Sequence, residues 1–119
     1  MGLTSIEIKV KKSYESKSYK TVSFLVDSWA VYSVVNTNTL LSLGIKPYRR
    51  RVFFLANGEK IEREIGDAYF EYRNTGGASP VIFGQKGDSN LLGATTLEAL
   101  ELVLDPFKRE LRPLTMTLM

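Results

Sequence analysis

The residue types that this chain lacks limit the chemistry it can perform. It contains no cysteine and no histidine, which excludes a disulfide framework, a thiolate nucleophile, a Ser-His-Asp triad and a zinc site built from His or Cys. Any catalysis must use carboxylates, hydroxyls, amines or a bound cofactor. The most prominent combination is Asp27 and Ser28, which directly follow the apolar segment of residues 24–26. An isolated Asp-Ser pair at the end of a strand is usually a turn, so its surroundings determine its role.

The remaining polar clusters indicate surface rather than a second site. Basic residues at 9–12 and 49–51, together with several tyrosines, would suit a nucleic acid, but solvated strand ends explain them as well. Glutamates between residues 59 and 64 alternate with basic residues, which is typical of an exposed hairpin. Gly76-Gly77 lacks the Lys-Ser/Thr and the helix of a phosphate-binding loop. We therefore expect no metal, no cofactor and no nucleic-acid partner.

Length and composition favour a single domain spanning residues 1–119. The chain has 119 residues, of which 44% are hydrophobic and 24% are charged, and its formal net charge is +3. One hydrophobic core is usual at this length, and the charge excess is too small to indicate a polyanionic partner. No apolar run approaches the roughly 20 residues of a membrane helix, and the N-terminus lacks the pattern of a signal peptide. We therefore expect a cytoplasmic protein with no membrane partner.

The strands around Asp27 are predicted from apolar periodicity. Alternation over residues 6–10 indicates one strand, and residues 21–26 indicate a second strand after a polar turn. A third strand is expected over residues 31–35, which are rich in β-branched side chains. The acid thus lies between two strand segments.

The strongest local pattern is a hairpin at about residues 51–64. Asn57 and Gly58 separate the strand-like segments 52–56 and 59–65. Because Asn-Gly readily adopts the two positive φ angles of a type I′ turn, we expect that turn here.

Two short helices are expected, over residues 37–43 and from residue 95 to about 105. Asn36 or Thr37 can cap the first helix, and Gly44 directly follows its end. The second helix begins with a predicted capping box between Thr95 and Glu98.

The second half of the chain adds further strands. Residues 67–73 and 81–83 are strand-like, and the Gly-rich segment 75–80 between them is expected to be a turn. The tail over residues 110–119 has the pattern of an exposed strand that needs a partner. Together these elements predict a mostly β domain, a small closed or partly closed barrel with two short helices.

The order of these elements resembles the retropepsin-like aspartic proteases, the retroviral type of acid protease. In that family a strand leads into Asp-Thr/Ser-Gly-Ala, followed by a β-branched strand, a short helix, a flap hairpin, and then two hydrophobic residues, a glycine and a helix. The corresponding residues here are 24–30 (Phe-Leu-Val-Asp-Ser-Trp-Ala) and 91–94 (Leu-Leu-Gly-Ala). The resemblance covers about residues 21–114, and residues 91–106 look especially like the small prokaryotic members.

The resemblance implies a role for each matching residue. Asp27 would be the catalytic acid and base, and the hydroxyl of Ser28 would tie two active-site loops together. The active-site loop would comprise Ser28, Trp29 and Ala30, the flap tip Ala56, Asn57, Gly58 and Glu59, and the side-chain pockets Val34, Ile82, Phe83 and Leu92. Ordinary core positions explain the last four residues equally well.

The resemblance also implies a twofold homodimer. An aspartic protease needs two carboxylates that share a proton, one acting as base toward a water and the other donating to the carbonyl oxygen. Of the four aspartates in the chain, only Asp27 lies in the motif, so the second must come from another copy. The strand at residues 6–10 and the tail after Pro113 are candidates for an intersubunit sheet. The expected substrate is an extended peptide with apolar side chains flanking the cleaved bond.

Trp29 departs from the motif, because it stands where the family has glycine. An indole there must point into the cleft, under the flap or toward the partner subunit. We expect it to crowd the cleft and to lower the activity. Three hypotheses remain: a homodimeric aspartic endopeptidase, a catalytically impaired dimer that binds peptides or serves as an assembly module, and a small basic β-barrel that binds nucleic acid.

Overall fold

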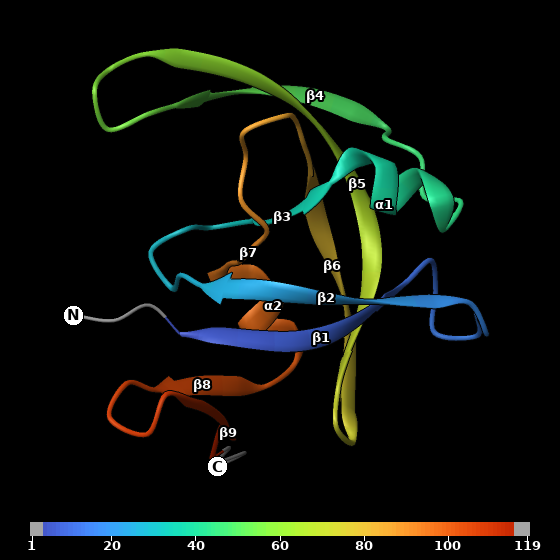
Figure 1. Cartoon of the computed structure of the whole chain (residues 1–119), viewed down its shortest axis with the longest axis vertical. Helices are drawn as coiled ribbons and strands as arrows, with labels where there is room; N and C mark the ends of the chain where they lie inside the picture. Colours follow the sequence, from blue (N-terminus) through green and yellow to red (C-terminus); the bar gives the residue numbers. More distant parts are fainter. Residues whose placement is uncertain (1–3, 116–119) are drawn as a thin grey trace, which may run out of the picture.

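The fold is mostly β, with two short helices, as the sequence predicts (Figure 1). The computed structural model describes residues 4–115. Its elements, in chain order, are β1 (Ser5–Lys11), β2 (Tyr19–Val26), β3 (Ser33–Asn36), α1 (Thr37–Ser42), β4 (Arg49–Phe54), β5 (Lys60–Tyr72), β6 (Thr75–Gly84), β7 (Leu91–Leu92), α2 (Ala94–Ala99), β8 (Leu102–Asp105) and β9 (Glu110–Pro113).

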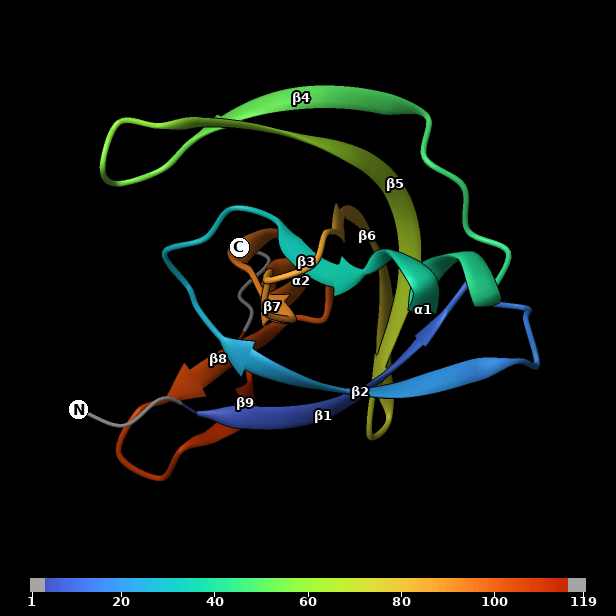
Figure 2. The same ribbon diagram turned by 45° about the horizontal axis from the view of Figure 1, so that its top comes forward.

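Most of the strands belong to one sheet that returns on itself. Its order is β1-β2-β7-β3-β6-β5-β4, and β1 also pairs with β5. This additional pairing closes six strands into a ring, while β4 extends outside the ring as a partner of β5. The hairpin of β4 and β5 therefore projects beyond the ring and overhangs the connection between β2 and β3 (Figure 2). β8 and β9 form a separate two-stranded sheet.

One hydrophobic cluster packs the ring strands against α2. The alternation predicted for the first strand is visible here, since Ile8 and Val10 are buried while Glu7 and Lys9 are exposed. The rings of Phe24 and Phe70 lie 6.1 Å apart at the centre of this cluster. α2 contributes Leu97, and Leu100 at its C-terminal end is fully buried.

The Gly-rich segment at residues 75–80 is a strand, so the predicted turn is wrong. It forms the first part of β6 and pairs with β5, with Tyr72 opposite Thr75. A Cβ at Gly77 would lie 2.5 Å from the carbonyl oxygen of Ala99, and one at Gly76 would lie 2.5 Å from the hydroxyl of Tyr69. These glycines therefore permit close packing of β6 against β5 and α2 rather than a reversal of the chain.

The predicted hairpin at residues 51–64 is present, but its turn type is not I′. Gly58 has a φ of +88°, whereas Asn57 does not have a positive φ. The N–H of Gly58 donates to the carbonyl of Leu55 (2.9 Å), and the N–H of Leu55 donates to the carbonyl of Glu59 (2.8 Å). This pattern is a three-residue loop with glycine in the left-handed position. The Asn57 side chain accepts instead from the N–H of Glu59 (2.9 Å).

The first helix agrees with its predicted signals, and the second does not. Asn36 caps α1 by accepting from the N–H of Asn38 (2.9 Å), and Gly44 ends the turn with a φ of +80°. α2 begins after Gly93 with no side-chain cap, so the predicted capping box is absent. The chain then turns at Glu101, with a φ of +57°, and continues as a strand instead of a helix to residue 105.

The strand edges proposed for an intersubunit sheet are partly occupied within the chain. β1 pairs with β2 along its whole length and with β5 over Lys9–Lys11. β9 pairs with β8, with Leu111 opposite Leu104. Of the predicted tail strand, residues 116–119 lie outside the described residues. The third strand, expected from residue 31, begins at Ser33.

Candidate active site

Asp27 directly follows β2 and organises a tight turn. Its Oδ1 accepts a hydrogen bond from the N–H of Trp29 (3.0 Å), and its carbonyl accepts one from the N–H of Ala30 (3.1 Å). Within residues 4–115 its Oδ2 accepts no hydrogen bond, and the side chain is only half-buried. The turn thus fixes the direction of a carboxylate that keeps one oxygen available.

The turn at residues 27–31 is bonded to the segment that precedes α2. The N–H of Asp27 donates to the carbonyl of Leu92 (2.9 Å), and the N–H of Ala94 donates to the carbonyl of Ala30 (2.7 Å). Thr95 donates in the same way to Val31 (2.9 Å). The structure therefore brings together the two segments, 24–30 and 91–94, that carry the sequence resemblance.

A chain of buried hydroxyls lies behind this turn. The N–H of Gly93 donates to Ser33 Oγ (2.9 Å), Ser33 contacts Thr96 Oγ1, and Thr96 Oγ1 lies 2.9 Å from Ser79 Oγ. Ser79 donates in turn to the carbonyl of Pro80 (3.1 Å). Only one direction uses every hydroxyl hydrogen once: Ser33 donates to Thr96, and Thr96 donates to Ser79. We refer to Ser33, Thr96 and Ser79 as the hydroxyl relay.

Sequence reasoning did not find the hydroxyl relay. It assigned the structural hydroxyl to Ser28, which is exposed and makes no side-chain hydrogen bond in the part of the chain that is described. The available signal was a serine inside the apolar run 31–35. Position 93 has no room for a side chain, because a Cβ there would lie 2.6 Å from the carbonyl group of Tyr32.

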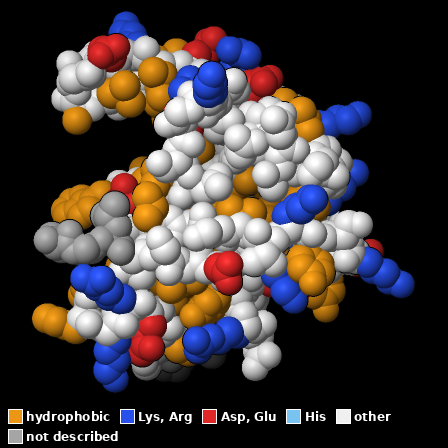
Figure 3. Space-filling view, in the orientation of Figure 1, with side chains coloured by type: hydrophobic (Ala, Val, Ile, Leu, Met, Phe, Trp, Pro, Cys, Tyr) orange, Lys and Arg blue, Asp and Glu red, His pale blue; other side chains and the backbone are white. Residues whose placement is uncertain are grey.

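A cleft of about 800 Å³ separates the β4–β5 hairpin from the body of the molecule. It is visible as the deep notch in Figure 3. Its walls come from residues 30–34, from the hairpin over residues 51–63, and from the loop before β7. Asp27 does not line the cleft, but Ala30, which its carbonyl holds, does. The Asp27 turn therefore reaches the edge of the cleft, while the carboxylate itself is not part of the cleft wall in a single chain.

The predicted pocket residues divide into two pairs. Val34 and Ile82 line the cleft, whereas Phe83 and Leu92 are core residues, 1% and 0% exposed. Of the hairpin tip, Ala56, Asn57, Gly58 and Glu59 are exposed and do not line the cleft. The preceding Leu55 lines it instead.

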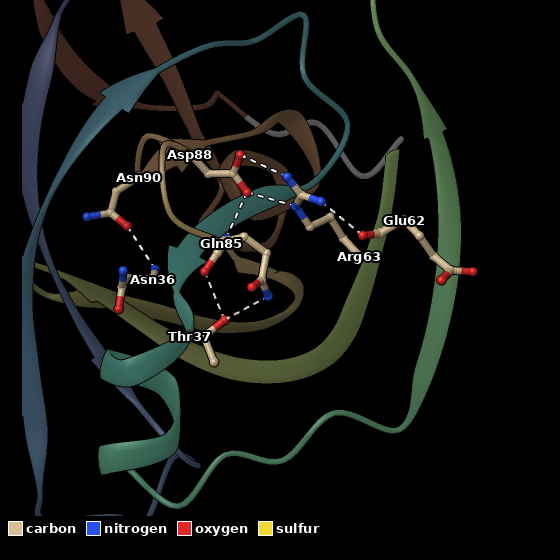
Figure 4. Close-up of polar contacts among 8 residues, drawn as sticks. Asn36, Thr37, Glu62, Arg63, Gln85, Asp88 and Asn90 are labelled. Carbon is tan, nitrogen blue, oxygen red and sulfur yellow. Dashed lines mark hydrogen bonds and ion pairs between the residues drawn. The ribbon is translucent and has the colours of Figure 1, made fainter. Parts of the chain in front are cut away.

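A bidentate ion pair connects the hairpin to the loop before β7 (Figure 4). Arg63 of β5 donates from Nε to Asp88 Oδ2 (2.8 Å) and from Nη2 to Asp88 Oδ1 (3.1 Å). The N–H of Gln85 also donates to Asp88 Oδ2 (2.8 Å). The guanidinium holds the pKa of Asp88 below its ordinary value, and the carboxylate raises the pKa of Arg63. Both side chains line the cleft.

Trp29 lies at the most exposed point of the Asp27 turn. Its side chain is 96% exposed and does not line the cleft of the single chain. It does not have a positive φ, so the backbone at this position does not require glycine. The turn projects at the same end of the molecule as the hairpin tip and the β8–β9 turn (Figures 1 and 2). At these tips Phe54 is 70% exposed and Phe107 is 96% exposed.

Among residues 4–115, no group of three or more acidic side chains is arranged to hold a metal ion. The basic residues at 9–12 and 49–51 do not form one uniform patch, since Lys11 pairs with Glu71 (3.3 Å) and Arg50 pairs with Glu62 (2.9 Å). No helix in the described range is long and apolar enough to cross a membrane.

Comparison with known protein families and with curated proteins finds no match to this chain.

Proposed function

We propose that the chain is a retropepsin-like aspartic endopeptidase that acts as a twofold homodimer. The observation that carries this proposal is the Asp27 turn, which is bonded to residues 92–95 at the edge of a cleft roofed by a hairpin. The ring of six strands supports the part of the proposal that concerns the small barrel of this protease type. No metal or cofactor takes part in the mechanism that follows.

The other aspartates are engaged elsewhere, which supports Asp27 as the catalytic residue. Asp67 accepts from the hydroxyl of Tyr48 (3.0 Å), and Asp88 binds Arg63. Asp105 caps the β8–β9 turn and faces Arg112 (3.6 Å). Within residues 4–115 the side chain of Asp27 bonds only to its own turn. A chain that supplies one such carboxylate needs a second copy to form a proton-sharing pair.

In the proposed dimer the two Asp27 carboxylates share one proton around the twofold axis. The ionised carboxylate removes a proton from a water, whose oxygen attacks the peptide carbonyl carbon, while the protonated one donates to the carbonyl oxygen. The carboxyl group that took the water's proton then gives it to the amide nitrogen, the C–N bond breaks, and the other carboxylate takes up the proton that a hydroxyl of the intermediate loses as the carbonyl re-forms. The β4–β5 hairpin closes over the extended peptide and pairs with its backbone.

The exposed apolar tips favour the dimer. Trp29, Val31 and Phe107 are 96%, 64% and 96% exposed, and the turns that carry them lie at one end of the molecule (Figure 1). Large apolar side chains gathered at one end are typical of a surface that another protein covers. We propose that this end meets the second copy and that each indole packs across the interface.

Mass and activity measurements test the proposal. Light scattering at micromolar concentration should give twice the chain mass of 13.4 kDa, and apolar peptides should be hydrolysed best at acidic pH. Asp27→Asn should keep the dimer and lose hydrolysis, because an amide cannot accept the proton of the water. Asp67→Asn is the matched control and should keep both the dimer and the hydrolysis of peptides. A monomer that hydrolyses peptides, or an active Asp27→Asn variant, contradicts the mechanism. A dimer that binds peptides without cleaving them supports the impaired-dimer hypothesis.

A further inference from the structure

The two faces of the β4–β5 hairpin carry different charges. Arg51 lies opposite Arg63 and Phe53 lies opposite Ile61 in the strand register, and all four residues line the cleft. On the other face Arg50 pairs with Glu62 (2.9 Å) and with Glu64 (3.8 Å), and none of these three lines the cleft. The acidic residues of the hairpin are therefore kept away from the cleft.

Arg51 differs from the other hairpin arginines because the described part of the chain offers it no partner. Arg63 is bound by Asp88, Arg50 by Glu62, and Arg49 donates to the hydroxyl of Tyr32 (3.5 Å). Within residues 4–115, Arg51 forms no ion pair and no side-chain hydrogen bond. Asp88 is the one acidic residue in the cleft wall of the described chain, and Arg63 occupies both of its oxygens.

We propose that Arg51 selects a carboxylate side chain of the bound peptide, so that this cleft prefers peptides with Asp or Glu near an apolar centre. This inference rests on the proposed peptide-binding function of the same cleft. Arg51 is exposed at the cleft wall, so its guanidinium is accessible to a ligand, and its planar fork suits a carboxylate. Acidic peptides match the excess positive charge, whereas basic peptides would add a second unpaired cation.

The geometry of the hairpin also sets the spacing of the preferred residues. Arg51 and Phe53 are two residues apart on one strand and face the same cleft. In an extended peptide, side chains on one face also repeat every two residues, about 6.6–6.8 Å apart. A peptide strand laid along the hairpin therefore places an acidic residue two positions from an apolar one. In the dimer the symmetry mate repeats this arrangement on the other side of the cleaved bond.

Matched nonapeptides with a Leu-Phe centre test the inference. Glu, Gln or Lys is placed in turn at each of the other positions, and kcat/KM is measured for the wild-type chain. Binding to the Asp27→Asn variant is measured by calorimetry, so that recognition is separated from hydrolysis. We expect about a tenfold preference for Glu over Gln at one position on each side of the centre, weakening as salt is added. Arg51→Gln should abolish this preference, and Arg51→Glu should convert it to a preference for Lys.

Arg50→Gln is the matched control, because it removes the same charge from the same strand on the opposite face. It should keep the Glu preference. If both variants lose the Glu preference equally, the preference is a diffuse charge effect and the role of Arg51 is overturned. Peptide binding or cleavage without a Glu preference would overturn it too, and so would the absence of any peptide binding. If Glu peptides bind preferentially but are never cleaved, the specificity stands and the peptidase mechanism fails. Circular dichroism of each variant establishes that the hairpin sheet is intact.

Discussion

Replacing Thr96 with valine should destabilise the fold through the hydroxyl relay. Thr96 is fully buried, and its hydroxyl lies between Ser33 and Ser79. Valine has almost the same shape, so packing is retained while both hydrogen bonds are lost. Ser33 then has no acceptor for its hydrogen, and Ser79 loses its donor.

The expected magnitude follows from the two groups left unsatisfied. Each buried polar group without a partner costs about 1–3 kcal/mol, so the free energy of unfolding should fall by roughly 3 kcal/mol. For a chain of this length, that corresponds to a decrease in Tm of roughly 10–15 °C. Ser33→Ala should cost a similar amount, because it leaves the N–H of Gly93 without its acceptor and Thr96 Oγ1 without its donor.

Urea unfolding followed by circular dichroism measures the effect. Thr95→Val is the matched control on the same helix, since Thr95 is half-buried and its hydroxyl makes no hydrogen bond in the described chain. Its free energy of unfolding should stay within about 0.5 kcal/mol of wild type. The double variant Ser33→Ala/Thr96→Val should be less destabilised than the sum of the single variants, because both act on one network. Equal stability of Thr96→Val and Thr95→Val would refute the relay.

Three further predictions concern the dimer, the cleft and the sheet. Trp29→Gly should raise the dimer Kd by an order of magnitude or more in sedimentation, as for other buried interface tryptophans. If the fully dimeric variant instead has a higher kcat/KM than wild type, the indole crowds the cleft. Asp88→Asn should cost about 1 kcal/mol near neutral pH. Because the pKa of Asp88 is lowered in the folded chain, the advantage of the wild type should shrink as the pH falls below 3.8, the ordinary value. A difference that does not shrink as the pH is lowered would contradict the ion pair. Gly77→Ala should lower Tm by several degrees, since its Cβ would lie 2.5 Å from the Ala99 carbonyl oxygen; an unchanged Tm would show that α2 shifts freely.

Much of the strand pattern was predictable because it depends on local alternation. The buried Ile8 and Val10 of β1 and the Asn-Gly hairpin are visible in a short window of sequence. Segment 75–80 was not predictable in this way, because glycine is common both in turns and at close contacts in a sheet. The contact between Gly77 and Ala99 exists only after α2 has packed on β6.

The candidate site shows the same division. Asp27 and residues 91–94 were found from their order along the chain, and the structure joins them by backbone hydrogen bonds. The hydroxyl relay escaped detection because its three members come from β3, β6 and α2 and have no local spacing. In the proposed dimer the partner of Trp29 belongs to a second chain, which no local pattern specifies.

A mixing experiment tests the central claim, that each active site needs Asp27 from two chains. Wild type and Asp27→Asn are unfolded together in equal amounts, refolded so that the chains pair at random, and assayed at constant total protein. If both carboxylates are required, only wild-type homodimers are active and the rate should be roughly one quarter of that of pure wild type. A rate of about one half, in direct proportion to the wild-type chains present, would show that each chain acts on its own, and a rate of about three quarters would show that one Asp27 per dimer is enough; either result would contradict the shared site.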